Sequence, residues 1–94
     1  MFDKMKQVME FKKQADRIKR ELDAVTVDVN EVRGIKVVVS GSQEFQSLQI
    51  DADLLGQERK RDLERDLLRS FNAAVKKSQQ MAAQKMASAM PGMM

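Results

Sequence analysis

The middle of the chain alternates apolar and polar residues with the period of two that is typical of half-buried β-strands. Three such segments follow one another, at residues 25–29, 35–40 and 45–51. The apolar side of the second and third segments consists of Ile35, Val37, Val39, Leu48 and Ile50. The pattern predicts a small three-stranded antiparallel sheet with one apolar face, which needs a helix packed against it.

Spacings of three and four residues replace this alternation before and after the sheet, as in helices with one apolar face. The first helix is predicted from Phe2 to about Ala24, with an apolar seam at Val8, Phe11, Ala15, Ile18, Leu22 and Val25. Such a helix is about 35 Å long, so part of its seam must meet a second helix, of this chain or of another copy. The last helix is predicted from about Gln57 to Met86, which makes residues 1–86 one domain followed by a flexible, Met-rich tail at 87–94.

The composition excludes several classes of chemistry. The 94 residues include no cysteine and no histidine, which removes disulfides, the usual zinc ligands and the common proton shuttle. No apolar run approaches the roughly 20 residues of a membrane span, and charges interrupt the apolar residues at the N-terminus before a secretory signal could form. We expect a soluble cytoplasmic protein with no catalytic residues, metal, cofactor or small-molecule substrate. A core this thin favours oligomerisation.

The charge is distributed unevenly, although the formal net charge is only +3. Both predicted helical regions are net basic, whereas the sheet region is net acidic. Basic stripes follow one face of the first helix (Lys6, Lys13, Arg17 and Arg20) and one face of the last (Arg61, Arg65, Arg69 and Lys76). Either stripe could be a solvated face of ordinary surface charges or a surface that binds a polyanion.

Several local strings carry a family resemblance: residues 34–41, 48–55, 62–67 and 71–77, and the Pro-Gly-Met of the tail. In their order and spacing the chain resembles the YbaB/EbfC family of bacterial nucleoid-associated proteins over nearly its whole length. The resemblance implies an α+β fold with an α-β-β-β-α subunit, and a homodimer joined through the sheets. It also implies helices that grip double-stranded DNA with little or modest sequence preference. The setting that it implies is the bacterial cytoplasm and nucleoid, with a role in nucleoid organisation or gene regulation.

Two sets of site residues follow from this combined interpretation. For phosphate contacts we expect Lys6, Lys13, Arg17, Arg20, Arg65, Arg69, Lys76 and Lys77. For the dimer interface we expect Ile35, Val37, Val39, Leu48 and Ile50.

A protein of another class remains an alternative. Two helices joined by β-hairpin elements also describe a prefoldin-like holdase or a coiled-coil adaptor, in which the seam and the methionines would bind protein chains. An enzyme has the least support, because Asp28, Asp51 and Asp53 are interpreted as strand and cap residues.

Overall fold

The computed structural model describes residues 2–89 and confirms the predicted α+β order of elements. Helix α1 (Phe2–Ala24) is followed by the strands β1 (Thr26–Val32), β2 (Ile35–Ser40) and β3 (Phe45–Ile50). Two single-turn 3₁₀ segments, η1 (Ala52–Leu54) and η2 (Gln57–Arg59), then lead into α2 (Lys60–Ala89). Helix α2 therefore ends three residues beyond the predicted Met86, and residues 90–94 of the predicted tail lie outside the described residues.

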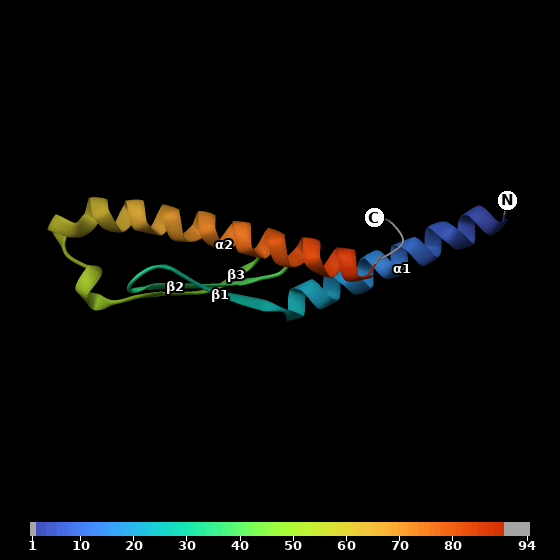
Figure 1. The fold of residues 1–94 in the computed structure, drawn as a ribbon, viewed down its shortest axis with the longest axis horizontal. Helices are drawn as coiled ribbons and strands as arrows, with labels where there is room; N and C mark the ends of the chain where they lie inside the picture. The colour runs from blue at the N-terminus through green and yellow to red at the C-terminus, as the bar shows by residue number, and fades with distance from the viewer. Residues whose placement is uncertain (1, 90–94) are drawn as a thin grey trace.

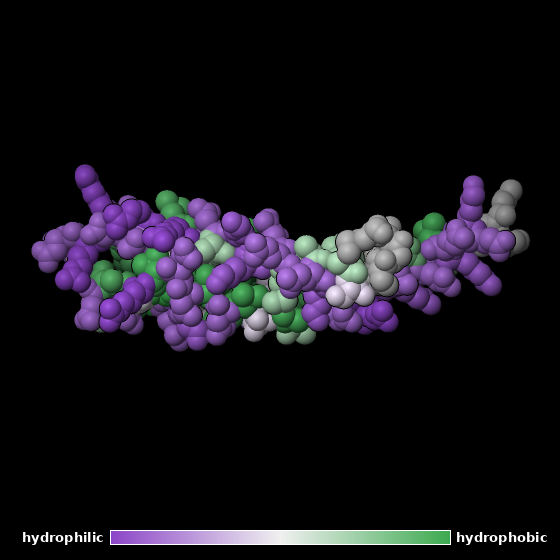
Figure 2. Space-filling view, viewed as in Figure 1, coloured by the Kyte–Doolittle hydropathy of each residue, from purple (hydrophilic) through white to green (hydrophobic). Residues whose placement is uncertain are grey.

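The subunit is elongated, with extents of 67 × 21 × 17 Å. Helix α2 runs along the sheet, and its last turns lie beside α1, which projects beyond it (Figure 1). Figure 2 shows hydrophilic residues over most of this view, with apolar residues gathered where α2 meets the sheet and near the free end of α1. No helix within residues 2–89 combines the length and the apolar character needed to cross a bilayer.

The strands form one antiparallel sheet in the order β1-β2-β3. Val37 at its centre pairs with Val29 on β1 and with Leu48 on β3, so these three side chains share a face. The β1–β2 turn contains Gly34 at φ +91°, a left-handed conformation that favours glycine. A Cβ there would also lie 2.9 Å from a methyl carbon of Leu54, so a larger residue would have to displace that side chain as well as adopt the left-handed φ.

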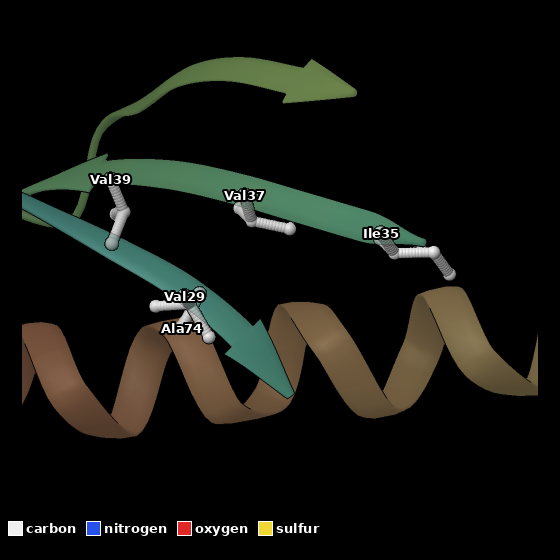
Figure 3. Close-up of a cluster of buried hydrophobic side chains, with 5 residues drawn as sticks. All are labelled: Val29, Ile35, Val37, Val39 and Ala74. Atoms are coloured by element: carbon white, nitrogen blue, oxygen red, sulfur yellow. The ribbon is translucent and has the colours of Figure 1, made fainter. Parts of the chain in front are cut away.

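The core lies between the sheet and α2. Val29, Ile35, Val37 and Val39 point toward α2 and meet Ala74, each with at most 1% of its surface exposed (Figure 3). Ile35, Val37 and Val39 of the predicted dimer interface therefore face the chain's own helix and are buried within the subunit. The sequence shows that one face of the sheet must be covered, but it does not show which helix covers it.

Helix α2 packs mainly on β1 and β2, and it leaves β3 largely uncovered. Leu48 is 43% exposed and Ile50 is half-buried, so these two members of the predicted interface do reach the surface. Strand β3 is also an edge strand, since β2 is its sole neighbour among the described strands. Both its outer backbone edge and part of its apolar side are therefore open.

Helix α1 is held at its C-terminal end by a tight joint. The Gly41 N–H donates to the carbonyl oxygen of Leu22 in the last turn of α1 (3.0 Å) and to that of Val25, the residue that follows α1 (2.9 Å). On the other side of the joint, the Ser78 hydroxyl of α2 donates to the Ser40 carbonyl oxygen at 2.7 Å. The end of α1, the end of β2 and the middle of α2 are thus tied together at one level.

The predicted seam of α1 meets a second helix over only part of its length. Ile18 is 6% exposed and Leu22 is half-buried where α1 contacts α2. Farther toward the N-terminus the same seam is open, with Phe11 56% and Val8 67% exposed. The free part of α1 is therefore a projecting helix with little core of its own.

Candidate nucleic-acid interface

Four basic residues share the side of α1 that is roughly opposite the buried Ile18, since successive residues are about 100° apart around a helix. They are Lys6, Lys13, Arg17 and Arg20, all exposed, and they are called the α1 basic face below. Lys13, Arg17 and Arg20 line one shallow groove together with Glu21 and Ala24. The structure thus brings this predicted group together on one surface.

The charges of the α1 basic face are not neutralised within the chain. None of the ion pairs found among the described residues involves α1. Glu21 lies one helical turn from Arg17, but the two side chains do not form an ion pair within 4.0 Å. Of the two interpretations of a basic stripe, this arrangement favours a surface that is free to bind anions.

The basic residues near the start of α2 are arranged differently. Arg65 lies 3.4 Å from an Asp62 carboxylate oxygen and 3.3 Å from one of Asp66. Arg69 lies 3.3 Å from a carboxylate oxygen of Glu31 on β1. Both guanidinium groups therefore face carboxylates of the same chain, which reduces their attraction for an external phosphate.

Lys76 and Lys77 are exposed and take part in none of the ion pairs among the described residues. They directly precede Ser78 and so lie at the joint where α1 begins to project, close to the level of Arg20. Arg65, in contrast, lies about 20 Å farther along α2. The eight predicted DNA contacts thus divide into six that are near or on α1 and two that are distant and paired.

The outward face of the sheet is polar. Asp28 and Lys36 lie on it, because their neighbours Val29 and Val37 point into the core, and they form an ion pair at 3.4 Å. The carboxylates of the described residues do not cluster either: no group of three or more His, Cys, Asp or Glu side chains is placed to hold a metal ion. The outward face therefore offers neither a basic nor an apolar patch to a partner.

A third exposed surface lies where β3 meets α2, and the sequence analysis identified only Leu48 and Ile50 of it. Phe45 of β3 meets Phe71 of α2 edge to face, with ring centroids 5.0 Å apart, yet Phe45 is 44% exposed. Leu68, three residues before Phe71 on the same side of α2, is 66% exposed. We call Phe45, Leu48, Ile50, Leu68 and Phe71 the β3–α2 shelf. The alternation in residues 45–50 was a signal for the β3 part, but a register shift opposite Val38 and Val39 determines where Phe45 points.

Comparison with known proteins places this geometry in a family. The model of the YbaB/EbfC DNA-binding family matches residues 1–94. A protein of Syntrophobacter fumaroxidans (strain DSM 10017 / MPOB) named "Nucleoid-associated protein" is 34% identical over 86 residues, which cover 90% of this chain and 78% of that protein. Together with the helix-sheet-helix architecture, these matches show that the chain belongs to the YbaB/EbfC DNA-binding family.

Proposed function

We propose that this protein is nucleoid-associated and binds duplex DNA as a homodimer, mainly through phosphate contacts from the α1 basic face. The observation that carries the proposal is the contrast between the two helices: the cations of α1 have no partner among the described carboxylates, whereas Arg65 and Arg69 do. Family membership and the name of the relative support a DNA ligand. Lysine and arginine that neutralise phosphates release condensed counterions, and this release drives binding.

The same residues favour DNA shape over base sequence. Contacts to phosphate carry no direct sequence information, and the α1 basic face consists of long, flexible cationic side chains. The chain has no tryptophan or tyrosine, so it has few aromatic rings on which unpaired bases could stack. We therefore expect duplex DNA to bind more tightly than single strands, with little discrimination between sequences.

The dimer is proposed to form through the β3–α2 shelf. An open strand edge next to exposed apolar side chains is the kind of surface that a second copy covers. Stacking of two sheets through their outward faces is disfavoured, because that face carries the Asp28–Lys36 pair. Pairing along β3 would leave α1 of each subunit free, so a dimer would present two α1 basic faces. We expect Leu68→Asp on α2 to shift sedimentation toward the monomer, whereas Gln46→Ala, at an exposed position of β3 outside the shelf, should leave it unchanged.

The decisive test is the salt dependence of DNA binding, measured by fluorescence anisotropy of a labelled random duplex. If a dimer neutralises about six phosphates, the logarithm of affinity falls against the logarithm of salt concentration with a slope of about −5. The variant with Lys13, Arg17 and Arg20 replaced by alanine should lose at least half of that slope. A slope near zero for the unaltered protein contradicts the proposal.

The matched control is the Arg65→Ala, Arg69→Ala variant, which removes two cations that already face carboxylates. We expect its salt slope to stay close to that of the unaltered protein. Equal losses of slope in the control and in the α1 variant would show that the position of the cations does not matter, and would refute the assignment to α1.

One observation favours the alternative of a protein-binding adaptor or holdase. Four large apolar residues on α1 are 56–67% exposed: Met5, Val8, Met9 and Phe11. Suppression of aggregation of an unfolded client, without salt-sensitive DNA binding, would support this alternative. This alternative requires that the four residues remain uncovered in the assembled protein.

A further inference from the structure

The exposed apolar residues of α1 divide into two groups by their positions around the helix. Successive residues are about 100° apart, so Phe11 lies within about 20° of Ile18, on the side that packs against α2. Met9, nine residues before Ile18, lies about 180° from it, and Met5 lies about 40° from Met9. Met9 is 62% and Met5 is 66% exposed, so both methionines lie on the side of α1 that faces away from α2.

Lysines surround Met9 on this side of the helix. Its neighbours on the helix surface, three or four residues away, are Met5, Lys6, Lys12 and Lys13. The three lysines are exposed, and none takes part in an ion pair among the described residues. Lys6 and Lys13 lie about 60° and 40° to one side of Met9, whereas Lys12 lies about 60° to the other side. Cations therefore flank an apolar centre on both sides.

The acidic residues of this part of α1 are placed differently. Within two turns of Met9 they are Asp3, Glu10 and Asp16. Asp3 and Glu10 lie at least about 100° around the helix from Met9, outside the flanking lysines. Asp16 lies two turns away and within about 20° of Met9, so it continues the central row and not the flanks. A carboxylate in such a central position can accept a hydrogen bond from the amino group of cytosine.

This arrangement matches the major groove of B-DNA. A helix with its side chains is about 10–12 Å wide, and the major groove, about 12 Å wide, admits one. The projecting part of α1 is free to enter such a groove (Figure 1). Phosphates line both walls of the groove, and base edges form its floor. The apolar group that the floor presents is the C5-methyl of thymine, and methionine side chains adapt to irregular apolar surfaces.

We infer that α1 lies in the major groove with Met9 pointing at the base edges, where its side chain packs on thymine methyl groups. Lys6 and Lys13 then bind phosphates of one wall and Lys12 binds those of the other, which adds Lys12 to the phosphate contacts. The inference rests on the proposed function, since it needs α1 to bind duplex DNA. The flanking charges select this occupant over an apolar protein surface, because such a surface would remove three unpaired lysines from water.

The salt series separates a contact of Met9 from contacts to phosphate. We expect Met9→Ala to weaken binding about fourfold at every salt concentration, the effect of losing the burial of roughly one methyl group, with no change of slope. Lys13→Ala should instead make the slope shallower by about 0.9. The matched control is Val8→Ala, because Val8 is 67% exposed but lies about 100° around the helix from Met9. An unchanged affinity in Met9→Ala, or an equal loss in Val8→Ala, would overturn the inference.

Replacement of thymine by uracil in the duplex tests the methyl contact directly, because uracil lacks the C5-methyl group. On a duplex rich in A·T pairs, we expect the unaltered protein to bind the uracil form about fourfold more weakly. Met9→Ala should bind the two forms with equal affinity. Equal losses in both proteins would show that uracil acts through the shape of the DNA. That result, or no loss in either protein, would overturn the inference.

The inference and the proposed function fail in different ways. A salt slope near zero in the unaltered protein contradicts DNA binding itself, whereas a steep slope without any effect of Met9→Ala overturns only the placement of Met9. Sedimentation of Met9→Ala tests the remaining occupant, which is a second copy of the chain. A shift toward the monomer would assign Met9 to a protein interface and would also overturn the inference.

Discussion

The joint at Gly41 makes a sharp prediction about how α1 is held. A Cβ at this position would lie 3.0 Å from both the carbonyl oxygen and a methyl carbon of Leu22, and 3.3 Å from its Cα. Two of these three atoms are backbone, so a side-chain rotation cannot relieve the contact. Gly41→Ala must therefore push the end of α1 away from β2, which also lengthens the hydrogen bonds from the Gly41 N–H to the Leu22 and Val25 carbonyls.

The size of the displacement follows from the geometry. Ordinary van der Waals contact begins at 3.4 Å, so the end of α1 must give by about 0.4 Å. If it pivots at Ile18, roughly 6 Å from Leu22, the helix tilts by about 4°, and Lys6, about 18 Å beyond Ile18, moves by roughly 1.2 Å. Lysine and arginine side chains can absorb such a shift, so we expect DNA affinity to fall by less than about threefold. The free energy of unfolding should fall by about 1–3 kcal/mol, as for other overpacked sites.

Urea unfolding at fixed protein concentration measures the free energy of unfolding, and anisotropy measures DNA affinity. Gln46→Ala is the matched control, since this exposed residue lies in the same hairpin and contributes nothing to the joint. An unchanged free energy of unfolding in Gly41→Ala would show that the end of α1 is not closely packed against Gly41. A loss of DNA affinity of more than about tenfold, with the free energy of unfolding unchanged, would mean that the exact position of α1 dominates binding. It would refute the expectation that the side chains absorb a small shift of the helix.

Three further predictions concern the same framework, each measured by urea unfolding. Ser78→Ala should cost only about 1 kcal/mol, because the Ser40 carbonyl keeps the hydrogen bond from the Gln43 N–H at 3.0 Å; a loss above about 3 kcal/mol would show that the acceptor is left unpaired. Gln43→Gly should stabilise the protein by about 0.5–1 kcal/mol, since φ is +67° there, whereas Gln43→Ala should not; destabilisation by glycine would contradict this account. Gly34→Ala should cost about 1–3 kcal/mol, and Leu54→Ala in the same chain should recover the steric part of that loss but not the part due to φ.

The sequence predicted the elements well because their signals are local. The alternation of Ile35, Val37 and Val39 determines which side of β2 is buried, and the seven-residue recurrence of Lys6, Lys13 and Arg20 determines that they share a side of α1. Both properties depend only on residues that are close along the chain. The side of the sheet that α2 covers is different, since it depends on packing between distant segments such as the Ser78 contact with Ser40.

The carboxylate partners of the α2 cations could not be predicted in full for the same reason. Arg69 appeared to continue a basic stripe, but its carboxylate partner Glu31 is 38 residues away in sequence and becomes its neighbour only when α2 packs on β1. The pairing of Arg65 with Asp62, at a spacing of three residues, was visible in the sequence and could have lowered the weight given to Arg65. Helix α1 escapes long-range pairing of the Arg69 kind because its free half packs against no other described element that could supply an acid, and its own acids form no ion pair within 4.0 Å.

This separation makes the proposed function open to a clean test. Ile18 is the one buried residue in the described part of α1, and the joint at Gly41 rather than the basic face holds the helix in place. The cations of that face are exposed and unpaired among the described residues, so replacing each by alanine, a strong helix former, should change stability by less than about 0.5 kcal/mol. A loss of DNA binding in the Lys13, Arg17 and Arg20 variant would then report lost phosphate contacts and not a lost fold. If that variant instead unfolded at clearly lower urea concentration, the basic face would have a structural role, and its assignment to DNA would lose its main support.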